Sequence, residues 1–364
     1  MQIARPHIGI ARATDERMLV TWGTLAPSLA VAALVTVAVA LFALSAGTVR
    51  IAPSTTLAVL LDHLPFVSVE GFTQTEEAIV WQVRLPRVLL AGMVGATLGL
   101  SGAAYQGVFR NPLAEPYIMG VAAGASVGAT LIIVSPLFVT AGMLSPVPLA
   151  AFGGAIIAVT LAYGLARVGR TFTTTSLILS GVAISSFGTS IVTYLMLTYS
   201  ERTIAVLNWV LGGFNTAQWL DAGILLPYAL LAALLLLPHA RILNVLQLDE
   251  DQARQLGVNV ERVKVTVLAV ASLATAAAVA VSGLIGFVGL IVPHTVRMIW
   301  GPDYRRVLPL SGFFGATFLI LADLIARTVD PGHEVPIGVV TAVVGAPFFL
   351  FLLRRQSRPI LERL

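Results

Sequence analysis

One short stretch of this sequence has the spacing of a catalytic serine motif. Gly124, Ser126 and Gly128 fit the pattern G-x-S-x-G, in which the serine is a nucleophile when a strand and a sharp turn precede a helix. The residues around Ser126 are small and apolar, which is typical of a helix interior. The pattern therefore favours packing. An intramembrane hydrolase stays as an alternative, and it predicts that Ser126→Ala abolishes activity.

The lysine content excludes ATP hydrolysis by this chain through a P-loop. A Walker A loop requires G-x-x-x-x-G-K-[ST], and the single lysine, Lys264, is flanked by Val263 and Val265. If the function needs ATP, the ATP and its Mg would be bound by a partner ATPase. Cysteine is absent and the histidines are scattered, so we expect no metal site and no cofactor here. Four of the five histidines are scattered between or near the predicted spans, at His63, His239, His294 and His333.

Asp323 is the acidic residue that we place well inside a predicted membrane span. Ionisable groups at such positions commonly mark ion pathways, so Asp323 could serve an ion-coupled secondary transporter. Arg327 follows at the i+4 position, where a carboxylate and a guanidinium on one helix form a local ion pair. The spacing favours the local pair, and the ion-coupled transporter stays as the alternative.

Two further groups of polar residues lie between apolar stretches. Residues 246–257 combine charges with a helix-like pattern and end in a glycine, which predicts a short amphipathic helix with a C-cap. Such a helix could contact a soluble partner or remain a solvated loop. The second group, Arg84, Arg87 and Arg327, would bind either lipid headgroups or an acidic partner protein.

The composition predicts helices that cross a membrane. Of the 364 residues, 57% are hydrophobic and 11% are charged, with a mean hydropathy of +0.91, whereas soluble domains carry about 25% charged residues. A membrane-spanning helix needs roughly 20 apolar residues, and we expect an all-α integral membrane protein with about ten such helices. The predicted spans are 24–46, 86–109, 114–134, 147–166, 172–199, 217–237, 263–283, 285–300, 307–328 and 337–354, and 203–213 is predicted to be a re-entrant or interfacial helix.

The positive charges predict the orientation of these spans. With a cytoplasmic N-terminus, 17 of the 22 Lys and Arg residues fall in inner segments and 5 in outer segments, as the positive-inside rule requires. This bias explains the pI of about 9.8 without nucleic acid as a partner. We expect a multi-pass protein of a bacterial or archaeal plasma (inner) membrane with both termini cytoplasmic. Residues 1–23 and 356–364 would be cytoplasmic tails, and 24–355 a single transmembrane domain.

Small residues recur at helical spacing in the second and third predicted spans. The two stripes are Gly92, Gly95, Gly99 and Gly102, then Gly120, Gly124 and Gly128. Such stripes let helix backbones approach closely in lipid. They predict packing between helices of one subunit, with a subunit interface as the alternative.

Several motifs follow one another in a fixed order. They are 84–87 (RLPR), 102–107 (GAAYQG), 111–116 (NPLAEP), 120–125 (GVAAGA), 286–294 (GFVGLIVPH), 321–327 (LADLIAR), 334–341 (EVPIGVVT) and 345–347 (GAP). Together they resemble the FecCD/BtuC-type permease family, the membrane subunits of type II ABC importers for iron-siderophores, haem or cobalamin. The resemblance covers about residues 80–355, and the N-terminal 80 residues match only as a span and a loop.

The resemblance implies a function and a set of partners. The chain would be the permease of a binding-protein-dependent ABC importer that moves a metal chelate into the cytoplasm by ATP-driven alternating access. Its partners would be a second copy in a homodimer, two cytoplasmic ABC ATPase subunits, a periplasmic or lipoprotein substrate-binding protein and the lipid bilayer. A ferric siderophore is the commonest chelate in this family. Cobalamin and haem stay open because these motifs are shared across the three substrates.

The resemblance also implies roles for particular residues. The cytoplasmic segment 244–262 would couple to the ATPase, and the outer arginines Arg84, Arg87 and Arg327 would dock the binding protein. The residues matching the coupling segment are Leu248, Glu250, Asp251, Ala253, Arg254 and Gly257. The residues matching a cytoplasmic gate are Asn111 and Leu113 in one loop and Thr174 and Thr175 in another.

Overall fold

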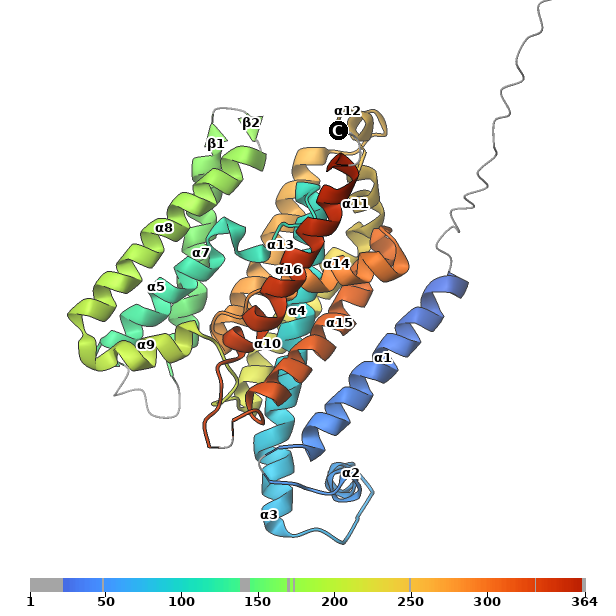
Figure 1. The fold of residues 1–364 in the computed structure, drawn as a ribbon, viewed down its shortest axis with the longest axis vertical. Coiled ribbons are helices and arrows are strands. Elements are labelled where there is room, and N and C mark those ends of the chain that lie inside the picture. The colour runs from blue at the N-terminus through green and yellow to red at the C-terminus, as the bar shows by residue number, and fades with distance from the viewer. Residues whose placement is uncertain are drawn as a thin grey trace, which may run out of the picture.

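The computed structural model describes residues 22–47, 49–137, 145–168, 171–172, 174–248, 250–330 and 332–361. Regular structure in this part of the chain is helical, apart from strands β1 (Arg167–Val168) and β2 (Thr171–Phe172), which pair antiparallel. As Figure 1 shows, α2 (Pro53–Asp62) and α3 (Gln74–Glu77) lie at one end of the helix bundle and α12 (Glu250–Gln255) at the other. We call these the α2 end and the α12 end.

Ten apolar helices correspond one to one with the ten predicted spans. They are α1 (Trp22–Ser45), α4 (Leu85–Phe109), α5 (Val121–Val134), α7 (Val147–Ala166), α8 (Thr174–Thr198), α10 (Trp219–Leu236), α13 (Val260–Ser282), α14 (Val288–Trp300), α15 (Tyr304–Ala326) and α16 (Ile337–Leu361). Within the described residues, seven of them are long and apolar enough to cross a membrane, and α5, α14 and the first part of α16 are shorter. The predicted all-α transmembrane fold is therefore confirmed.

The predicted tails are only partly described. Residues 1–21 of the predicted N-terminal tail and 362–364 of the C-terminal tail lie outside the described residues. Helix α16 extends to Leu361, through most of the predicted C-terminal tail. That helix is therefore longer than the apolar run from which its span was predicted.

A glycine sets the predicted boundary between the seventh and eighth spans. Helix α13 ends at Ser282, and Gly283 has a left-handed φ of 66°, which favours glycine because no Cβ is present. A Cβ added at Gly283 would also overlap the carbonyl oxygen of Trp209. Trp209 belongs to α9 (Thr203–Val210), within the predicted re-entrant helix. The break between α13 and α14 thus lies directly against α9.

Short helical segments connect the spans. The π-helical segment η1 (Ala78–Arg84) joins α3 to α4, η2 (Pro116–Met119) leads into α5, and η3 (Ser200–Arg202) leads into α9. At the α12 end, α10 continues through η4 (Leu237–His239) into α11 (Ala240–Leu246). The segments α2, α3 and η1 therefore extend the bundle at one end, while α11 and α12 extend it at the other.

Helix α4 forms the centre of the bundle. The helices α10, α13, α14 and α15 all pack against it. Gly95 of α4 meets Gly315 of α15, and a Cβ added to either glycine would overlap the backbone carbonyl of the other. Gly124 of α5 meets Gly154 of α7 in the same way. Both predicted glycine stripes therefore serve packing within the subunit.

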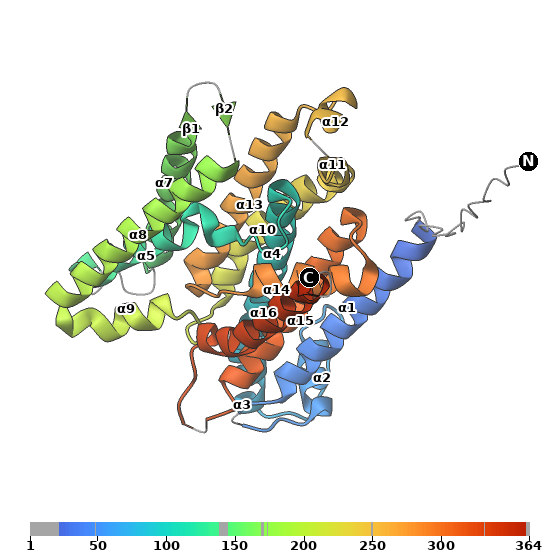
Figure 2. The ribbon, with the colours of Figure 1, turned by 45° about the horizontal axis from the view of Figure 1, so that its top comes forward.

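The remaining spans flank this centre. Helices α5, α7 and α8 pack together on one side, and α1 lies against α15 on the opposite side, as Figures 1 and 2 show. Helix α16 packs against α14 and α15. This arrangement leaves outward faces on α1, α8 and α10, and the chemistry of those faces indicates what surrounds them.

Candidate coupling, gate and docking sites

The predicted coupling segment forms a short helix at the α12 end. Helix α12 is followed by Gly257, whose φ is +81°, and the N–H of Val258 donates to the carbonyl oxygen of Ala253 at 3.1 Å. A helix with a glycine cap is therefore present, but it is shorter than the predicted 246–257, because Leu246 still belongs to α11. Ala253 is the buried residue of α12. The exposed residues of the predicted coupling set are Leu248, Asp251, Arg254 and Gly257.

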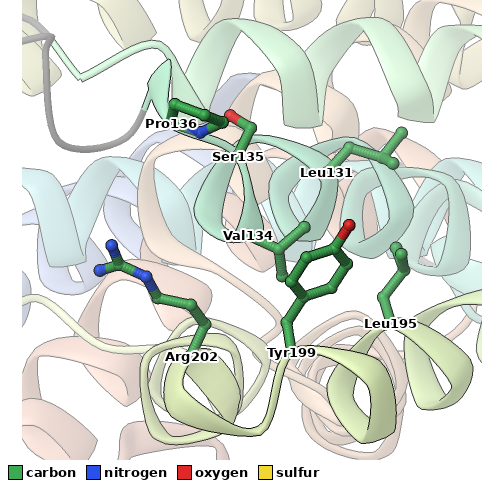
Figure 3. A pocket seen from close by; sticks show the side chains of 7 residues that line it. All are labelled: Leu131, Val134, Ser135, Pro136, Leu195, Tyr199 and Arg202. Carbon is green, nitrogen blue, oxygen red and sulfur yellow. The ribbon is translucent and has the colours of Figure 1, made fainter.

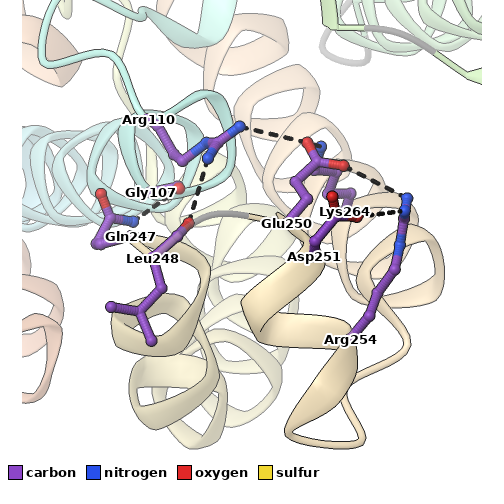
Figure 4. A network of polar contacts seen from close by, with 8 residues as sticks. All are labelled: Gly107, Arg110, Gln247, Leu248, Glu250, Asp251, Arg254 and Lys264. Carbon is purple, nitrogen blue, oxygen red and sulfur yellow. Dashed lines mark hydrogen bonds and ion pairs between the residues drawn. The ribbon is translucent and has the colours of Figure 1, made fainter.

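Glu250 connects α12 with the rest of the bundle. Its Oε1 accepts a hydrogen bond from Lys264 Nζ at 2.6 Å and lies 3.4 Å from Nη2 of Arg110, as Figure 4 shows. Arg254 lies 3.6 Å from Oε2 of the same carboxylate. The hydrogen bond from Lys264, with the neighbouring charges of Arg110 and Arg254, holds the pKa of Glu250 below its ordinary value. Glu250 therefore stays ionised and joins α12 to the start of α13.

Arg110 joins the same segment to the end of α4. Its φ of +50° lies in the left-handed region, which is uncommon for a residue other than glycine. Its guanidinium donates to the carbonyl oxygen of Leu248 at 3.2 Å and to Glu250 at 3.4 Å. Gln247 adds a second connection, because its Nε2 donates to the carbonyl oxygen of Gly107 at 3.0 Å. The coupling segment is therefore bonded to α4 at two points.

The predicted gate residues lie at the α12 end, but only Asn111 and Leu113 are in a loop, whereas Thr174 and Thr175 form the start of α8. Asn111 follows Arg110, and its side-chain oxygen accepts a hydrogen bond from the N–H of Leu113 at 2.9 Å, which fixes the turn between them. Asn111 is exposed and Leu113 is half-buried. Thr174 begins α8, and the side chain of Thr175 is exposed. The structure thus brings both predicted loops to the end that carries α12.

Glu115 and Tyr117 anchor the chain after the gate loop, and the sequence did not reveal this role. Glu115 Oε1 accepts a hydrogen bond from the N–H of Phe287 at 2.9 Å, and the Tyr117 hydroxyl donates to the carbonyl oxygen of Ile285 at 3.0 Å. Both contacts reach the break between α13 and α14. A glutamate at the start of the predicted span 114–134 was the available signal, but its spacing identified no partner.

The three predicted docking arginines lie at the α2 end, where they are buried. Arg84, Arg87 and Arg327 expose 5%, 8% and 7% of their surface. Arg84 donates to the carbonyl oxygens of Leu44 at 2.7 Å and Ser45 at 3.1 Å. These contacts fix the end of α1 to the beginning of α4.

A buried ion-pair network joins the other two arginines. Asp323 lies 2.8 Å from Arg87 Nε and 3.5 Å from Arg327 Nε, and Arg327 also donates to the carbonyl oxygen of Ala43. The predicted local pair of Asp323 and Arg327 is therefore present, with Arg87 as a further partner. Arg87 also lies 2.9 Å from Glu334, whose side chain is 40% exposed. Glu334 is thus the part of the network that a partner protein would reach first.

Ser126 has the surroundings of a packing residue. It is buried inside α5, and its hydroxyl donates to the carbonyl oxygen of Ala122 in the same helix at 2.9 Å. A nucleophilic serine of this motif is exposed at a turn between a strand and a helix, whereas Ser126 lies within a helix. In the part of the chain that the structure describes, no group of three or more His, Asp or Glu side chains could hold a metal ion.

The outward faces of α8 and α10 differ in chemistry. Hydroxyl groups are costly to place in hydrocarbon and aliphatic side chains are not. The exposed residues of α10 include Leu220, Ile224, Leu226, Leu230, Leu231 and Leu234. The exposed residues of α8 include Ser186, Thr189, Ser190, Thr193 and Thr198. Helix α10 therefore suits contact with lipid. Helix α8 also exposes large apolar side chains, among them Phe187 and Leu197, but between Ser186 and Thr193 it carries a hydroxyl face that suits water.

A hollow lies between α5 and α8 at the α2 end. Its volume is about 550 Å³. Figure 3 shows Tyr199, just beyond α8, pointing toward Val134 of α5, with Leu131, Leu195 and Arg202 also lining the hollow. The lining mixes apolar side chains with a phenol and a guanidinium.

Comparison with known proteins places the chain in a family. A model of the FecCD transport family matches residues 34–355. The chain belongs to the FecCD transport family. The cobalamin import system permease protein BtuC of Halobacterium salinarum is 44% identical over 287 residues, which cover 79% of this chain and 76% of that protein. The hemin transport system permease protein HmuU of Yersinia pestis is 39% identical, covering 78% of this chain and 86% of that protein.

A solved structure supports the same fold for this FecCD family member. An ABC transporter assigned to the metal-chelate type, in an inward-facing conformation, is 31% identical with a TM-score of 0.77, and the match covers 91% of this chain and 99% of that one. The predicted family is therefore confirmed. The family match begins at residue 34, so it also includes the second half of the first span, which the sequence motifs did not reach.

Proposed function

We propose that this FecCD family member is the permease subunit of an ATP-driven importer for metal chelates. The support comes from relatives named as permease proteins of systems for cobalamin, hemin and Fe(3+) dicitrate. Because the chain has no Walker A motif, ATP hydrolysis falls to two partner ABC ATPase subunits. The cargo is a metal chelate. A ferric siderophore is the first candidate, and cobalamin and haem fit the same class.

The observation that carries this proposal is the hydroxyl face of α8. The hydroxyls of Ser190 and Thr193 donate to the carbonyl oxygens of Ser186 and Thr189 at 2.9 Å each. Each hydroxyl oxygen can still accept a hydrogen bond, and because both side chains are exposed, water would satisfy them and lipid would not. We place this face on a water-filled path between two copies of the chain. Hydroxyls without charges let a bulky chelate pass without binding it tightly.

Single cysteines test this placement, because the natural chain has none. We expect Ser190→Cys and Thr193→Cys to react with a membrane-impermeant thiol reagent about tenfold faster than cysteines at matched positions on α10, because the reacting thiolate forms in water and not in lipid. The controls are Leu230→Cys and Leu234→Cys, at positions that are 60% and 70% exposed in the subunit. Equal labelling rates on the two helices would show that α8 does not line the water-filled path.

The energy input of the proposed importer acts at the α12 end. The outward side chains of Leu248, Asp251 and Arg254 provide an apolar and a charged surface for an ATPase subunit. This placement agrees with the excess of positive charge that the topology assigns to the cytoplasmic side. We therefore propose that α12 is the element that an ATPase subunit moves.

The binding protein of the proposed importer would dock at the α2 end. The three arginines proposed for docking have partners inside the chain. We propose that they hold the docking platform in shape and that Glu334, bonded to Arg87 at 2.9 Å, is a first point of contact. The ion-coupled alternative needs Asp323 to exchange protons. The two guanidinium groups beside Asp323 instead make it a member of a structural ion-pair network.

A further inference from the structure

We propose that Arg110 is the positioning residue that transmits movement of α12 to the gate loop, residues 111–114. This inference rests on the proposed function, in which an ATPase subunit moves α12 and the gate loop closes the path. It depends on three sets of contacts. One links α12 to Arg110, one makes the gate loop move as a unit, and one fixes the far side of that loop to the core.

The first set of contacts makes Arg110 follow α12. Its guanidinium contacts the carbonyl oxygen of Leu248 at 3.2 Å and Glu250 at 3.4 Å, on the two sides of residue 249. A guanidinium is a planar fork that can hold two acceptors in a fixed relation. Glu250 in turn is bonded at 2.6 Å to Lys264, a buried residue of α13. Glu250 belongs to α12, so a displacement of α12 moves this acceptor of Arg110.

The second set of contacts makes the gate loop respond as one piece. Helix α4 ends at Phe109, so Arg110 is the first residue beyond the helix, and it has a left-handed backbone. Asn111 follows directly, and its side chain is bonded to the N–H of Leu113 at 2.9 Å. Because this turn is closed by its own hydrogen bond, a rotation at Arg110 carries Asn111 and Leu113 with it.

The third set of contacts holds the other side of the loop still. Glu115 is bonded to the N–H of Phe287, and the Tyr117 hydroxyl bonds both the carbonyl oxygen and the N–H of Ile285. These partners belong to the break between α13 and α14. The break packs on α9, and α13 and α14 both pack on α4. The gate loop is therefore held between a joint that follows α12 and an anchor that belongs to the core.

A purely structural tie at Arg110 would make a different prediction from a transmitting joint. If Arg110 only stabilises the fold, its loss lowers the amount of folded transporter. The amount of chelate moved per ATP hydrolysed then stays the same. A transmitting joint changes the amount of chelate moved per ATP hydrolysed. The ratio of uptake to hydrolysis therefore separates the two roles.

The experiment uses the complete transporter, with its ATPase and binding protein, in proteoliposomes. The variants are Arg110→Gln, Arg110→Lys, Glu250→Gln and the double variant Arg110→Gln with Glu250→Gln. The control is Arg241→Gln, which removes one exposed positive charge from the same end of the molecule. ATP hydrolysis and uptake of labelled chelate are measured in the same vesicles, and the bound ATPase is quantified.

We expect each Arg110 variant and Glu250→Gln to keep the bound ATPase and to lower uptake per ATP about tenfold, a coupling change within the usual range. The double variant should lower it no further, because both single changes break one connection. The control should match the natural chain. Three results would contradict the role proposed for Arg110. They are an unchanged ratio of uptake to ATP hydrolysis, a double variant whose loss is the product of the two single losses, and loss of the bound ATPase from Glu250→Gln. No ATP-dependent uptake by the natural chain would instead contradict the proposed function.

Discussion

Asp323→Asn is expected to lower the free energy of unfolding by about 3 kcal/mol or more, because removing one partner of a buried ion pair leaves uncompensated charge. Asp323 lies between Arg87 and Arg327, both of which are buried. Arg87 would retain Glu334 at 2.9 Å, while Arg327 would lose its carboxylate and retain the carbonyl oxygen of Ala43. The measurement is unfolding of the purified chain in detergent by titration with a denaturing surfactant.

The matched control for this prediction is Asp330→Asn. The side chain of Asp330 is 56% exposed and lies 3.8 Å from that of His333, which is also exposed, so its removal should change the unfolding free energy by less than about 1 kcal/mol. Adding Arg87→Gln to Asp323→Asn should cost less than the two single changes summed, since it removes one of the unpaired charges. Additive losses, or an Asp323→Asn chain as stable as the control, would contradict the assigned network.

Gly315→Ala and Gly312→Ala are expected to change stability in opposite directions, although both glycines lie on α15. A Cβ at Gly315 would overlap the carbonyl oxygen of Gly95 on α4, whereas a Cβ at Gly312 would meet nothing within 4 Å. Gly315→Ala should therefore destabilise the chain by about 1–3 kcal/mol through overpacking. Gly312→Ala should stabilise it by about 0.4–1 kcal/mol, because alanine loses less backbone freedom on folding.

The same surfactant titration compares these two glycine variants with the natural chain. Gly153→Ala on α7 extends the control, because a Cβ there meets nothing within 4 Å, while the neighbouring Gly154 meets Gly124. Gly154→Ala should therefore behave like Gly315→Ala. A shift of the titration midpoint in the same direction for all four variants would contradict the close backbone contacts assigned between α4 and α15 and between α5 and α7.

The spans could be predicted from the sequence because their physical requirement is local. Each needs an apolar run of helical length. The boundary between the seventh and eighth spans was the hardest to place, because residues 263–300 contain little that marks a turn, and the structure ends α13 at Ser282. The predicted helix at residues 246–257 followed from its charges and its final glycine. What the sequence showed was therefore the elements and their order along the chain.

The side-chain partners could not be predicted, because they lie far apart along the chain. Arg84 was expected to face outward, yet its acceptors are backbone carbonyls about forty residues earlier, at Leu44 and Ser45. Glu115 contacts the backbone of Phe287, 172 residues later. Hydrophobic periodicity in the sequence does not predict such a contact. Every residue has a backbone carbonyl, and almost every residue has an N–H, so the sequence does not identify which of them a side chain will bind. The sequence thus located charged groups without showing which of them are buried.

Transport in proteoliposomes tests the central claim most directly. The chain would be reconstituted with its ATPase and binding protein, and labelled ferric siderophore, haem and cobalamin would be offered separately. We predict uptake of one chelate that requires ATP, is lost when the Walker A lysine of the ATPase is replaced, and survives collapse of any proton gradient. Uptake driven by an imposed proton gradient without ATP would contradict the account and establish an ion-coupled transporter instead.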